Sequence, residues 1–293
     1  MKCRILIDNN TIIDRYFLGE PGLSFLIEAE GKRILFDTGY SNGFLENARK
    51  LGENLLDLDY IVFSHGHLDH TWGLDSLIKL YSEAKAESLN HKSPIIVGHP
   101  LVFETKLDED LGEIGSMISK EKASQHFKIQ LTKQPLWLTS NLVFLGEIER
   151  KNDFENKAPI GMISVAGAMS EDFMMDDSAQ VGSIQDDYML DDSALAYKTN
   201  KGLVIITGCS HSGICNIIEQ AKKVCNEDRI VDVIGGLHLL NPGKAQLDGT
   251  LDYLKKIKAT CLHPSHCTDL ASKIALSTVA QIKEVGSGLL IEY

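Results

Sequence analysis

The amino-acid sequence predicts an α+β protein built from two similar β-rich halves, and three observations support this fold class. Apolar runs at strand spacing alternate with amphipathic segments at helical spacing through most of the 293 residues. The order hairpin, helix, strand occurs twice along the chain. Histidines and carboxylates directly follow several of the strands, as a metal site at one edge of a sheet requires. We therefore expect a single domain, residues 1–293, in which strand ends of both halves converge on one metal centre.

The composition excludes several classes of protein. The formal net charge is −12, so we expect no nucleic-acid partner, because a phosphate backbone is bound by a clustered basic face. No apolar run is long enough for a membrane span, and the N-terminus lacks the apolar core of a secretion signal. The six cysteines form no Cys-x-x-Cys pair, which favours reduced thiols, mostly small and buried, and a cytoplasmic location.

Strand and helix signals alternate regularly through the first half. Apolar and β-branched runs predict strands, and apolar residues at helical spacing predict helices. The expected strands are 1–8, 23–29, 32–36, 59–64, 94–99, 137–138 and 142–145, and the expected helices are 45–51 and 72–86. Gly52 is expected to end the first of these helices, because glycine readily adopts the left-handed conformation found there.

The second half repeats this order. Its expected strands are a hairpin over 194–206, then 229–234, 260–264 and 289–291, and its expected helices are 214–224, 247–257 and 271–279. A shift of the chain by 169 residues places Thr38-Gly39 on Thr207-Gly208 and Asp69 on His238. Such a repeat predicts two halves that face each other across one centre.

Two segments lack clear periodicity. Residues 101–133 show only weak helical signals, and residues 151–192 are acidic and methionine-rich. We interpret both as inserted loops. Because the second is too long for an ordinary connection, we expect it to overhang the active site, with a solvated linker as the alternative.

The strongest chemical signal is Ser64-His65-Gly66-His67-Leu68-Asp69-His70, which directly follows an apolar strand. Alternate residues of an extended chain point the same way, so His65 and His67 can reach one ion. Where the chain turns, Asp69 and His70 can reach a second ion. Nitrogen and carboxylate ligands suit zinc, iron or manganese, and several histidines favour zinc or iron. A histidine-rich surface loop is the alternative interpretation.

More polar residues follow other expected strands: Asp37, Cys209, His211, His238 and His266. With the histidine motif and Leu35-Phe36-Asp37-Thr38-Gly39, this set resembles the metallo-β-lactamase superfamily over nearly the whole chain. Five further stretches resemble one branch more narrowly, that of 7,8-dihydropterin-6-yl-methyl-4-(β-D-ribofuranosyl)aminobenzene-5′-phosphate synthase. They are Gly146-Glu147-Ile148-Glu149-Arg150, Asp191-Asp192-Ser193-Ala194-Leu195, Thr207-Gly208-Cys209-Ser210-His211-Ser212-Gly213, Gly235-Gly236-Leu237-His238-Leu239 and His266-Cys267-Thr268.

The resemblance implies a four-layer αββα sandwich with two divalent metal ions at one edge of the sheets. Zinc is the first choice of metal, and iron or manganese are alternatives. His65 and His67 match the ligands of the first metal. Asp69, His70 and His266 match those of the second.

Other residues depart from the family pattern or support the metal ligands without binding metal themselves. Asp37 matches an aspartate that braces the motif loop by hydrogen bonds. Cys209 stands where many members have an aspartate that bridges the ions, so it is expected either to bind one ion or to be a core residue. His211 is our choice for the missing third ligand of the first metal, with a capping or buried histidine as the alternative. His238 is expected to contact substrate or donate a proton, and a structural role is the alternative.

These expectations describe a metal-dependent hydrolase or related transferase. Its substrate would be a phosphate- or ester-bearing small molecule, and the branch suggests a pterin or ribofuranosyl-aminobenzene phosphate type. Asp69 would orient the attacking water and His238 would protonate the leaving group. The alternatives are a phosphodiesterase or nuclease, a di-iron redox protein, and a metal-binding sensor without turnover. We assign the remaining histidines to surface or packing positions: His91, His99, His126 and His263.

Overall fold

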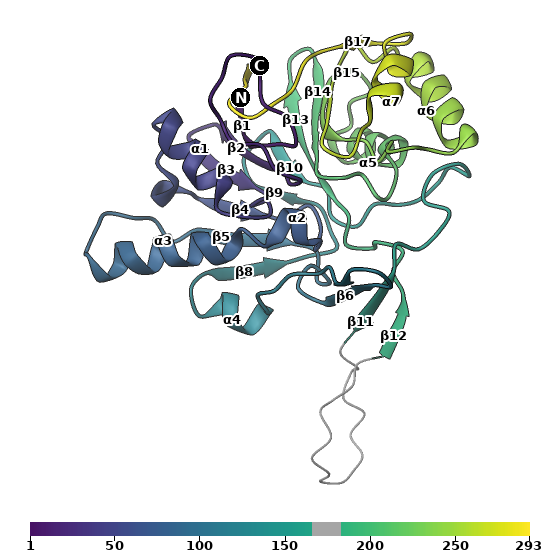
Figure 1. Cartoon of the computed structure of the whole chain (residues 1–293). Coiled ribbons are helices and arrows are strands. Elements are labelled where there is room, and N and C mark those ends of the chain that lie inside the picture. The colour runs from purple at the N-terminus through teal and green to yellow at the C-terminus, as the bar shows by residue number, and fades with distance from the viewer. Residues whose placement is uncertain (166–182) are drawn as a thin grey trace.

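Two seven-stranded sheets pack face to face at the centre of the structure, a computed structural model that describes residues 1–165 and 183–293. Helices α1 (Gly43–Leu51) and α3 (Leu74–Ala86) cover the outer face of one sheet, and α5 (Ile214–Cys225) and α6 (Lys244–Ile257) cover that of the other (Figure 1). The expected four-layer αββα sandwich is confirmed.

Both faces of each sheet are buried, which explains the nearly continuous apolar strands. On β3 (Lys32–Phe36), the side chain of Leu35 packs beneath the helices, while Ile34 and Phe36 belong to the core between the sheets. The same alternation holds in the second sheet, where Ile205 faces the helices and Val204 and Ile206 face the first sheet.

The two sheets have matching topologies. The first has the order β18 (Leu290–Glu292), β1 (Lys2–Ile7), β2 (Ser24–Ala29), β3, β4 (Tyr60–Val62), β5 (Ile95–Gly98), β8 (Lys128–Leu131). The second has the order β9 (Leu136–Trp137), β10 (Leu142–Phe144), β13 (Ala194–Thr199), β14 (Gly202–Thr207), β15 (Ile230–Gly236), β16 (Cys261–Ser265), β17 (Gln281–Ile282). Read in these directions, each sheet has antiparallel pairings up to its fourth strand and parallel pairings beyond it. The expected similarity of the two halves is therefore confirmed.

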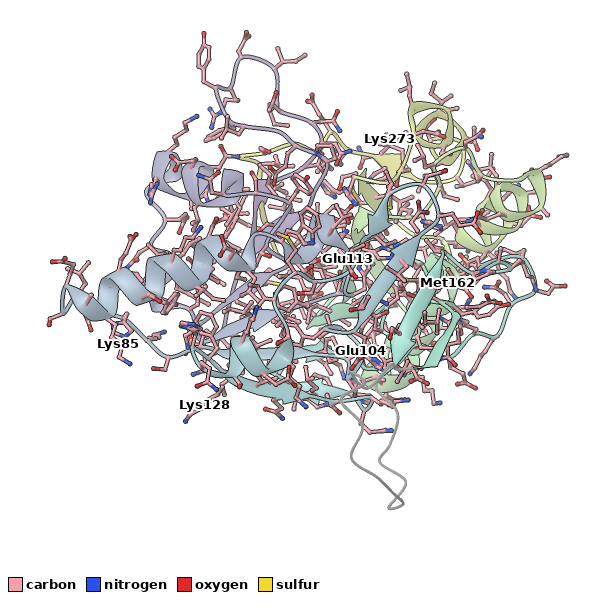
Figure 2. The ribbon with its side chains drawn as sticks, turned by 60° about the horizontal axis from the view of Figure 1, so that its bottom comes forward. Lys85, Glu104, Glu113, Lys128, Met162 and Lys273 are labelled. Atoms are coloured by element: carbon pink, nitrogen blue, oxygen red, sulfur yellow. The ribbon has the colours of Figure 1, made fainter. Side chains whose placement is uncertain are left out.

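The two segments interpreted as loops contain a third sheet. Its order is β12 (Ser183–Asp186), β11 (Met162–Val165), β6 (Thr105–Asp108), β7 (Gly112–Glu113), so strands of both segments pair with each other. Figure 2 shows this sheet from below, with Met162 on β11 and Glu113 on β7, the two strands that flank β6. The interpretation of these segments as loops was wrong here. The strands are short and mostly polar, so the sequence shows no clear alternation of apolar and polar residues from which to predict them. Residues 101–133 also contain α4 (Lys120–Ser124) and the edge strand β8. Residues 166–182 of the predicted overhanging loop lie outside the described residues.

The two ends of the chain meet beside β1 and β18 (Figure 1). The amino group of Met1 donates to the backbone oxygen of Tyr293 at 2.8 Å. The backbone N–H of Tyr293 donates to the backbone oxygen of Met1 at 2.9 Å. Within residues 1–165 and 183–293, no helix has the length and apolar character that a bilayer crossing needs. All six cysteines are free thiols. The cytoplasmic location stays a prediction.

Candidate metal centre

The predicted site residues lie where strands end at one edge of the two sheets. β3 and β4 run parallel, as do β14, β15 and β16, so their carboxyl ends point to the same side. Four residues just beyond these ends have positive φ angles near 50–60°: Asp37, Ser210, His238 and His266. Left-handed backbone at non-glycine residues is uncommon, and it turns the chain sharply enough to direct side chains back toward the sheet edge.

The first group of ligand-type side chains is His65, His67 and His211. One ring nitrogen from each lies within 4.8 Å of the others, and all three side chains are buried. In the part of the chain that the structure describes, Nε2 of His65, Nε2 of His67 and both ring nitrogens of His211 have no hydrogen-bond partner. Buried polar atoms are rarely left without a partner, so converging unpartnered nitrogens fit a metal ligand set.

The environment of this group keeps its rings neutral, as metal ligation requires. Burial, followed by the charge of Lys106, lowers the pKa of His67 to about 4. Burial and the neighbouring imidazoles hold the pKa values of His65 and His211 well below the usual range.

A hydrogen-bond chain from Asp37 fixes the ring of His65. The Oγ of Ser64 donates its one proton to Asp37 Oδ2 at 2.7 Å and must therefore accept from His65 Nδ1 at 2.9 Å. Nε2 of His65 then carries a lone pair that points at the other rings of the group. Asp37 thus has the bracing position that was expected of it.

The second group is Asp69, His70, Cys209 and His266, whose ligand atoms lie within 4.8 Å of one another. His70 Nε2 lies 3.3 Å from Cys209 Sγ, 3.2 Å from His266 Nε2 and 3.6 Å from Asp69 Oδ2. His70 Nδ1 donates to Asp37 at 2.8 Å, so its Nε2 also carries a lone pair. His266 Nδ1 faces Asn9 Oδ1 at 2.9 Å, which directs the Nε2 of His266 toward the same point.

Two groups in this set respond to the local charges. Burial opposes a positive charge on His266, but its hydrogen bond to Asp69 and the charges of Cys267 and Asp69 raise its pKa to about 9. A proton on His266 therefore serves as the counter-charge to Asp69 whenever no metal cation does. Burial raises the pKa of the Cys209 thiol, and coordination to a cation would make this sulfur a thiolate.

Gly208 allows the two halves to meet at this edge. A Cβ at this residue would lie 2.1 Å from Ser64 Oγ, so no other residue type fits. The loop that carries Cys209 consequently packs directly against the loop that carries the histidine motif.

His238 belongs to neither ligand group among the described residues. Its ring lies 4.5 Å from that of His211 between centroids, and its backbone N–H donates to Cys267 Sγ at 3.3 Å. Burial opposes protonation of its ring, but a hydrogen bond between the ring and Cys267 and the charge of Cys267 raise the pKa of His238. This position beside the centre is compatible with the predicted proton transfer, which stays a prediction.

Sequence reasoning missed a buried ion cluster behind the first group. Lys106 on β6 is fully buried, and its Nζ lies 2.8 Å from Asp187 Oδ2 and 3.0 Å from Asp191 Oδ1. Asp191 Oδ2 accepts the backbone N–H of Gly66 at 2.8 Å, between His65 and His67. The next residue, Asp192, accepts the backbone N–H of Ser212 at 2.8 Å, beside His211. The available signal was the acidic pair Asp191-Asp192 directly before an apolar strand.

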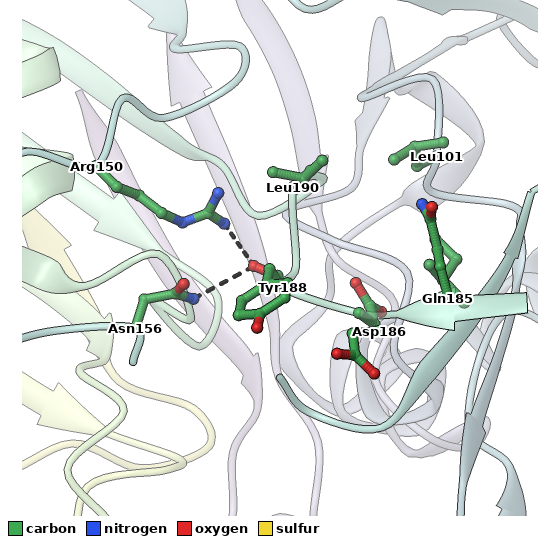
Figure 3. A pocket seen from close by; sticks show the side chains of 9 residues that line it. Leu101, Arg150, Asn156, Gln185, Asp186, Tyr188 and Leu190 are labelled. Carbon is green, nitrogen blue, oxygen red and sulfur yellow. Dashed lines mark hydrogen bonds between the residues drawn. The ribbon is translucent and has the colours of Figure 1, made fainter. Parts of the chain in front are cut away.

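Figure 3 shows a cavity of about 640 Å³ that is lined by residues outside the two ligand groups. Its lining includes Asn156, whose Nδ2 donates to the backbone oxygen of His211 at 2.7 Å. Arg150 lines it too and donates through Nη2 to the backbone oxygens of Tyr188 and Met189, at 2.6 and 2.8 Å. Tyr188 and Leu190 add apolar surface that is 42% and 38% exposed. The cavity therefore combines a fixed guanidinium and two carboxylates, Asp186 and Asp187, with apolar and aromatic contacts.

Comparison with known proteins agrees with this architecture. The family model of the metallo-beta-lactamase superfamily matches residues 18–144. The chain is 31% identical over 265 residues to 7,8-dihydropterin-6-methyl-4-(beta-D-ribofuranosyl)-aminobenzene-5'-phosphate synthase of Methanocaldococcus jannaschii. The aligned region covers 86% of this chain and 82% of that protein. It is 29% identical over 274 residues to an uncharacterized protein of the same organism, with 94% and 93% covered.

A solved structure is also similar. It is that of Tm1679, a metal-dependent hydrolase of the beta-lactamase superfamily, with a TM-score of 0.79, 26% identity and coverage of 100% of this chain and 99% of that one. The strand order, the position of the ligand groups and these relatives all agree. The chain therefore belongs to the metallo-beta-lactamase superfamily, in the branch of the M. jannaschii synthase.

Proposed function

We propose that this protein is a metal-dependent hydrolase or related transferase that acts on a phosphate- or ester-bearing small molecule. The observation that supports this most is the convergence of two donor sets, one of unpartnered imidazoles and one of mixed oxygen, nitrogen and sulfur atoms. His65, His67 and His211 would hold one divalent ion. Asp69, His70, Cys209 and His266 would hold the other. A donor set rich in imidazole with one thiol favours zinc over iron or manganese.

The chain's own residues divide the chemistry between them. Divalent ions at the two groups would supply Lewis-acid activation of water and electrostatic stabilisation of a developing oxyanion. Asp69, partly exposed beside His70 and His266, would orient the attacking water through its carboxylate. His238, with a raised pKa beside His211, would hold the proton that passes to the leaving group.

The cavity supports a substrate that joins an anionic group to an aromatic or apolar part. Arg150 provides a cation held in place by two carbonyls, and Tyr188 and Leu190 provide flat apolar surface. The synthase relative is named for a product with pterin, aminobenzene and ribofuranosyl phosphate parts, and a substrate of that type has this combination. We propose no nucleic-acid partner, since the formal charge of −12 disfavours a phosphate backbone.

Arg150→Gln is expected to raise KM about 10- to 100-fold with kcat nearly unchanged, because a hydrogen bond to a charged group contributes about 1.5–3 kcal/mol. Steady-state kinetics and competitive inhibition by inorganic phosphate measure this split. Lys133→Gln, which removes an exposed charge outside the cavity, is the matched control. Equal losses in kcat and kcat/KM would instead indicate that Arg150 acts through the geometry of the centre.

The function is tested by metal content together with turnover. Protein purified without chelator should contain transition metal, and dialysis against chelator should abolish turnover of at least one of a panel of phosphomonoesters, phosphodiesters, lactones and thioesters. Added zinc should restore it. Reaction in ¹⁸O-labelled water separates hydrolysis, which puts the label in the product, from transfer to another acceptor. Absence of bound metal, or turnover that survives its removal, contradicts the proposal.

The same panel decides between the alternatives. Cleavage of phosphodiesters alone would favour a phosphodiesterase or nuclease, and metal binding without any turnover would favour a sensor. A di-iron redox centre needs a carboxylate-rich donor set, whereas Asp69 is the one carboxylate in the two groups among the described residues. That donor set favours the hydrolytic or transfer chemistry.

A further inference from the structure

A third cluster of ligand-type side chains lies in the core, away from the metal centre. Asp232 is on β15, and Cys261 and His263 are on the neighbouring parallel strand β16. Asp232 pairs in register with Cys261, and His263 lies two residues further along on the same face as Cys261. The cluster shares no residue with either ligand group, and His263 lies three residues before the predicted ligand His266, about 10 Å along an extended chain. This cluster is therefore separate from both ligand groups.

The ligand atoms of this cluster lie close to the spacing that a tetrahedral ion imposes. His263 Nδ1 is 2.8 and 3.0 Å from the two oxygens of Asp232, and Cys261 Sγ is 3.9 Å from His263 Nδ1. All three ligand atoms fall within 4.8 Å of one another. Zinc bonds of about 2.0–2.3 Å at tetrahedral angles place ligand atoms roughly 3.3–3.6 Å apart. Shifts of about half an ångström would thus convert the present contacts into coordination.

The charge balance around the cluster favours a cation. Asp232 is 2% exposed, and the hydroxyl of Tyr293 donates to its Oδ2. Burial and the charge of Asp232 raise the pKa of Cys3 to about 12 and that of Cys261 to about 11, with Lys283 partly opposing the shift at Cys261. The carboxylate of Asp232 and the neutral thiol of Cys261 thus face His263, and a divalent ion would turn the thiol of Cys261 into a stabilised thiolate.

We propose that Asp232, Cys261 and His263 bind a zinc ion that is distinct from the metals of the active centre. Oxygen, sulfur and imidazole donors together suit zinc, and the partly exposed Cys261 marks the side from which the ion and a water ligand reach the site. Tyr293 would orient the carboxylate by its hydrogen bond. The ligands lie on β15 and β16 of the second sheet, and Tyr293, which bonds to Asp232, also pairs with Met1 beside the first sheet. The ion would therefore stabilise the contact between the two sheets near the chain ends.

Alkylation of the wild-type protein tests the site without any substitution. Cys261 should react with iodoacetamide in metal-free protein, and excess zinc should slow its modification at least tenfold, as measured by peptide mass spectrometry. Chelator should restore the original rate. Equal rates of modification with and without zinc would overturn the proposal and leave a hydrogen-bonded network of Asp232, His263 and Tyr293.

Metal stoichiometry provides the second test. Cys261→Ser combined with His263→Gln should bind one zinc equivalent fewer than wild type, while Cys225→Ser, which removes a buried thiol elsewhere, should bind the same number. In a Cys209→Ser background, cobalt should still give a sulfur-to-cobalt charge-transfer band, and adding Cys261→Ser should abolish it. Unchanged stoichiometry, or no such band in the Cys209→Ser protein, would overturn the proposal. Neither measurement uses turnover, so the result is independent of the proposed function.

Discussion

Asp37→Asn is expected to lower the affinity of the second ligand group for zinc by about 10- to 100-fold, the usual effect of removing a partner that orients a ligand histidine. Asp37 has φ of 59°, which asparagine tolerates, so the substitution leaves the backbone in place. The amide oxygen must accept from the backbone N–H of Ser64, as Asp37 Oδ1 does at 2.7 Å. The amide nitrogen then occupies the position of Oδ2, where His70 Nδ1 and Ser64 Oγ both donate.

In Asp37→Asn, the amide N–H group would face the N–H of His70, and two hydrogen-bond donors cannot pair. His70 can accept from the amide only if its own proton moves from Nδ1 to Nε2. Nε2 is the atom that faces Cys209 and His266, so the ring would present a proton to the metal in place of a lone pair. Competition with a chromogenic zinc chelator measures the affinity. Asp59→Asn, a carboxylate paired with Lys32 and Lys92 far from the centre, should bind zinc as wild type does. An unchanged affinity in Asp37→Asn would show that His70 is not a ligand.

Lys106→Met is expected to reduce the free energy of unfolding by about 3–5 kcal/mol, because it leaves buried carboxylates without their cation. Methionine fills nearly the same volume, so the loss reports charge and not a cavity. Asp187 and Asp191 are both buried and would keep only their bonds to backbone amides. Adding Asp187→Asn should recover part of the loss, since one uncompensated charge disappears.

Urea denaturation of metal-free protein measures this stability. Lys79→Met breaks an exposed ion pair with Asp75 and should change stability by less than about 1 kcal/mol. If Lys106→Met also lost less than about 1 kcal/mol of unfolding free energy, the assigned pairing of Lys106 with Asp187 and Asp191 would be contradicted.

The residues that could be predicted from the sequence are those fixed by local geometry. The alternation of His65 and His67 and the turn to Asp69 and His70 depend on the strand and loop that contain them, so their spacing is informative without tertiary structure. The structure also brings His211 to the first group, for which we chose it because it lies two residues past Cys209, and it brings Cys209 to the second group. Their role as ligands awaits the metal measurements.

The elements that could not be predicted depend on contacts distant in sequence. β6 and β11 stabilise each other across more than fifty residues; β6 has one apolar residue, Leu107, and β11 is only four residues long. Lys106 is a charged residue in a polar strand, and nothing local indicates that Asp187 and Asp191 will bury it. His263 was assigned to packing or surface, because its place beside Asp232 is set by the pairing of β15 with β16.

The pairing of β6 with β11 has a consequence for how substrate range can change. One strand is contributed by each of two separate insertions, and the same insertions supply the lining of the cavity through Leu101, Ile163 and Tyr188. A chimera that takes one insertion from a relative would break the sheet and unpair Lys106 from its aspartates. Exchange of both insertions together preserves these contacts and transplants specificity, while the metal ligands, which lie outside them, stay untouched.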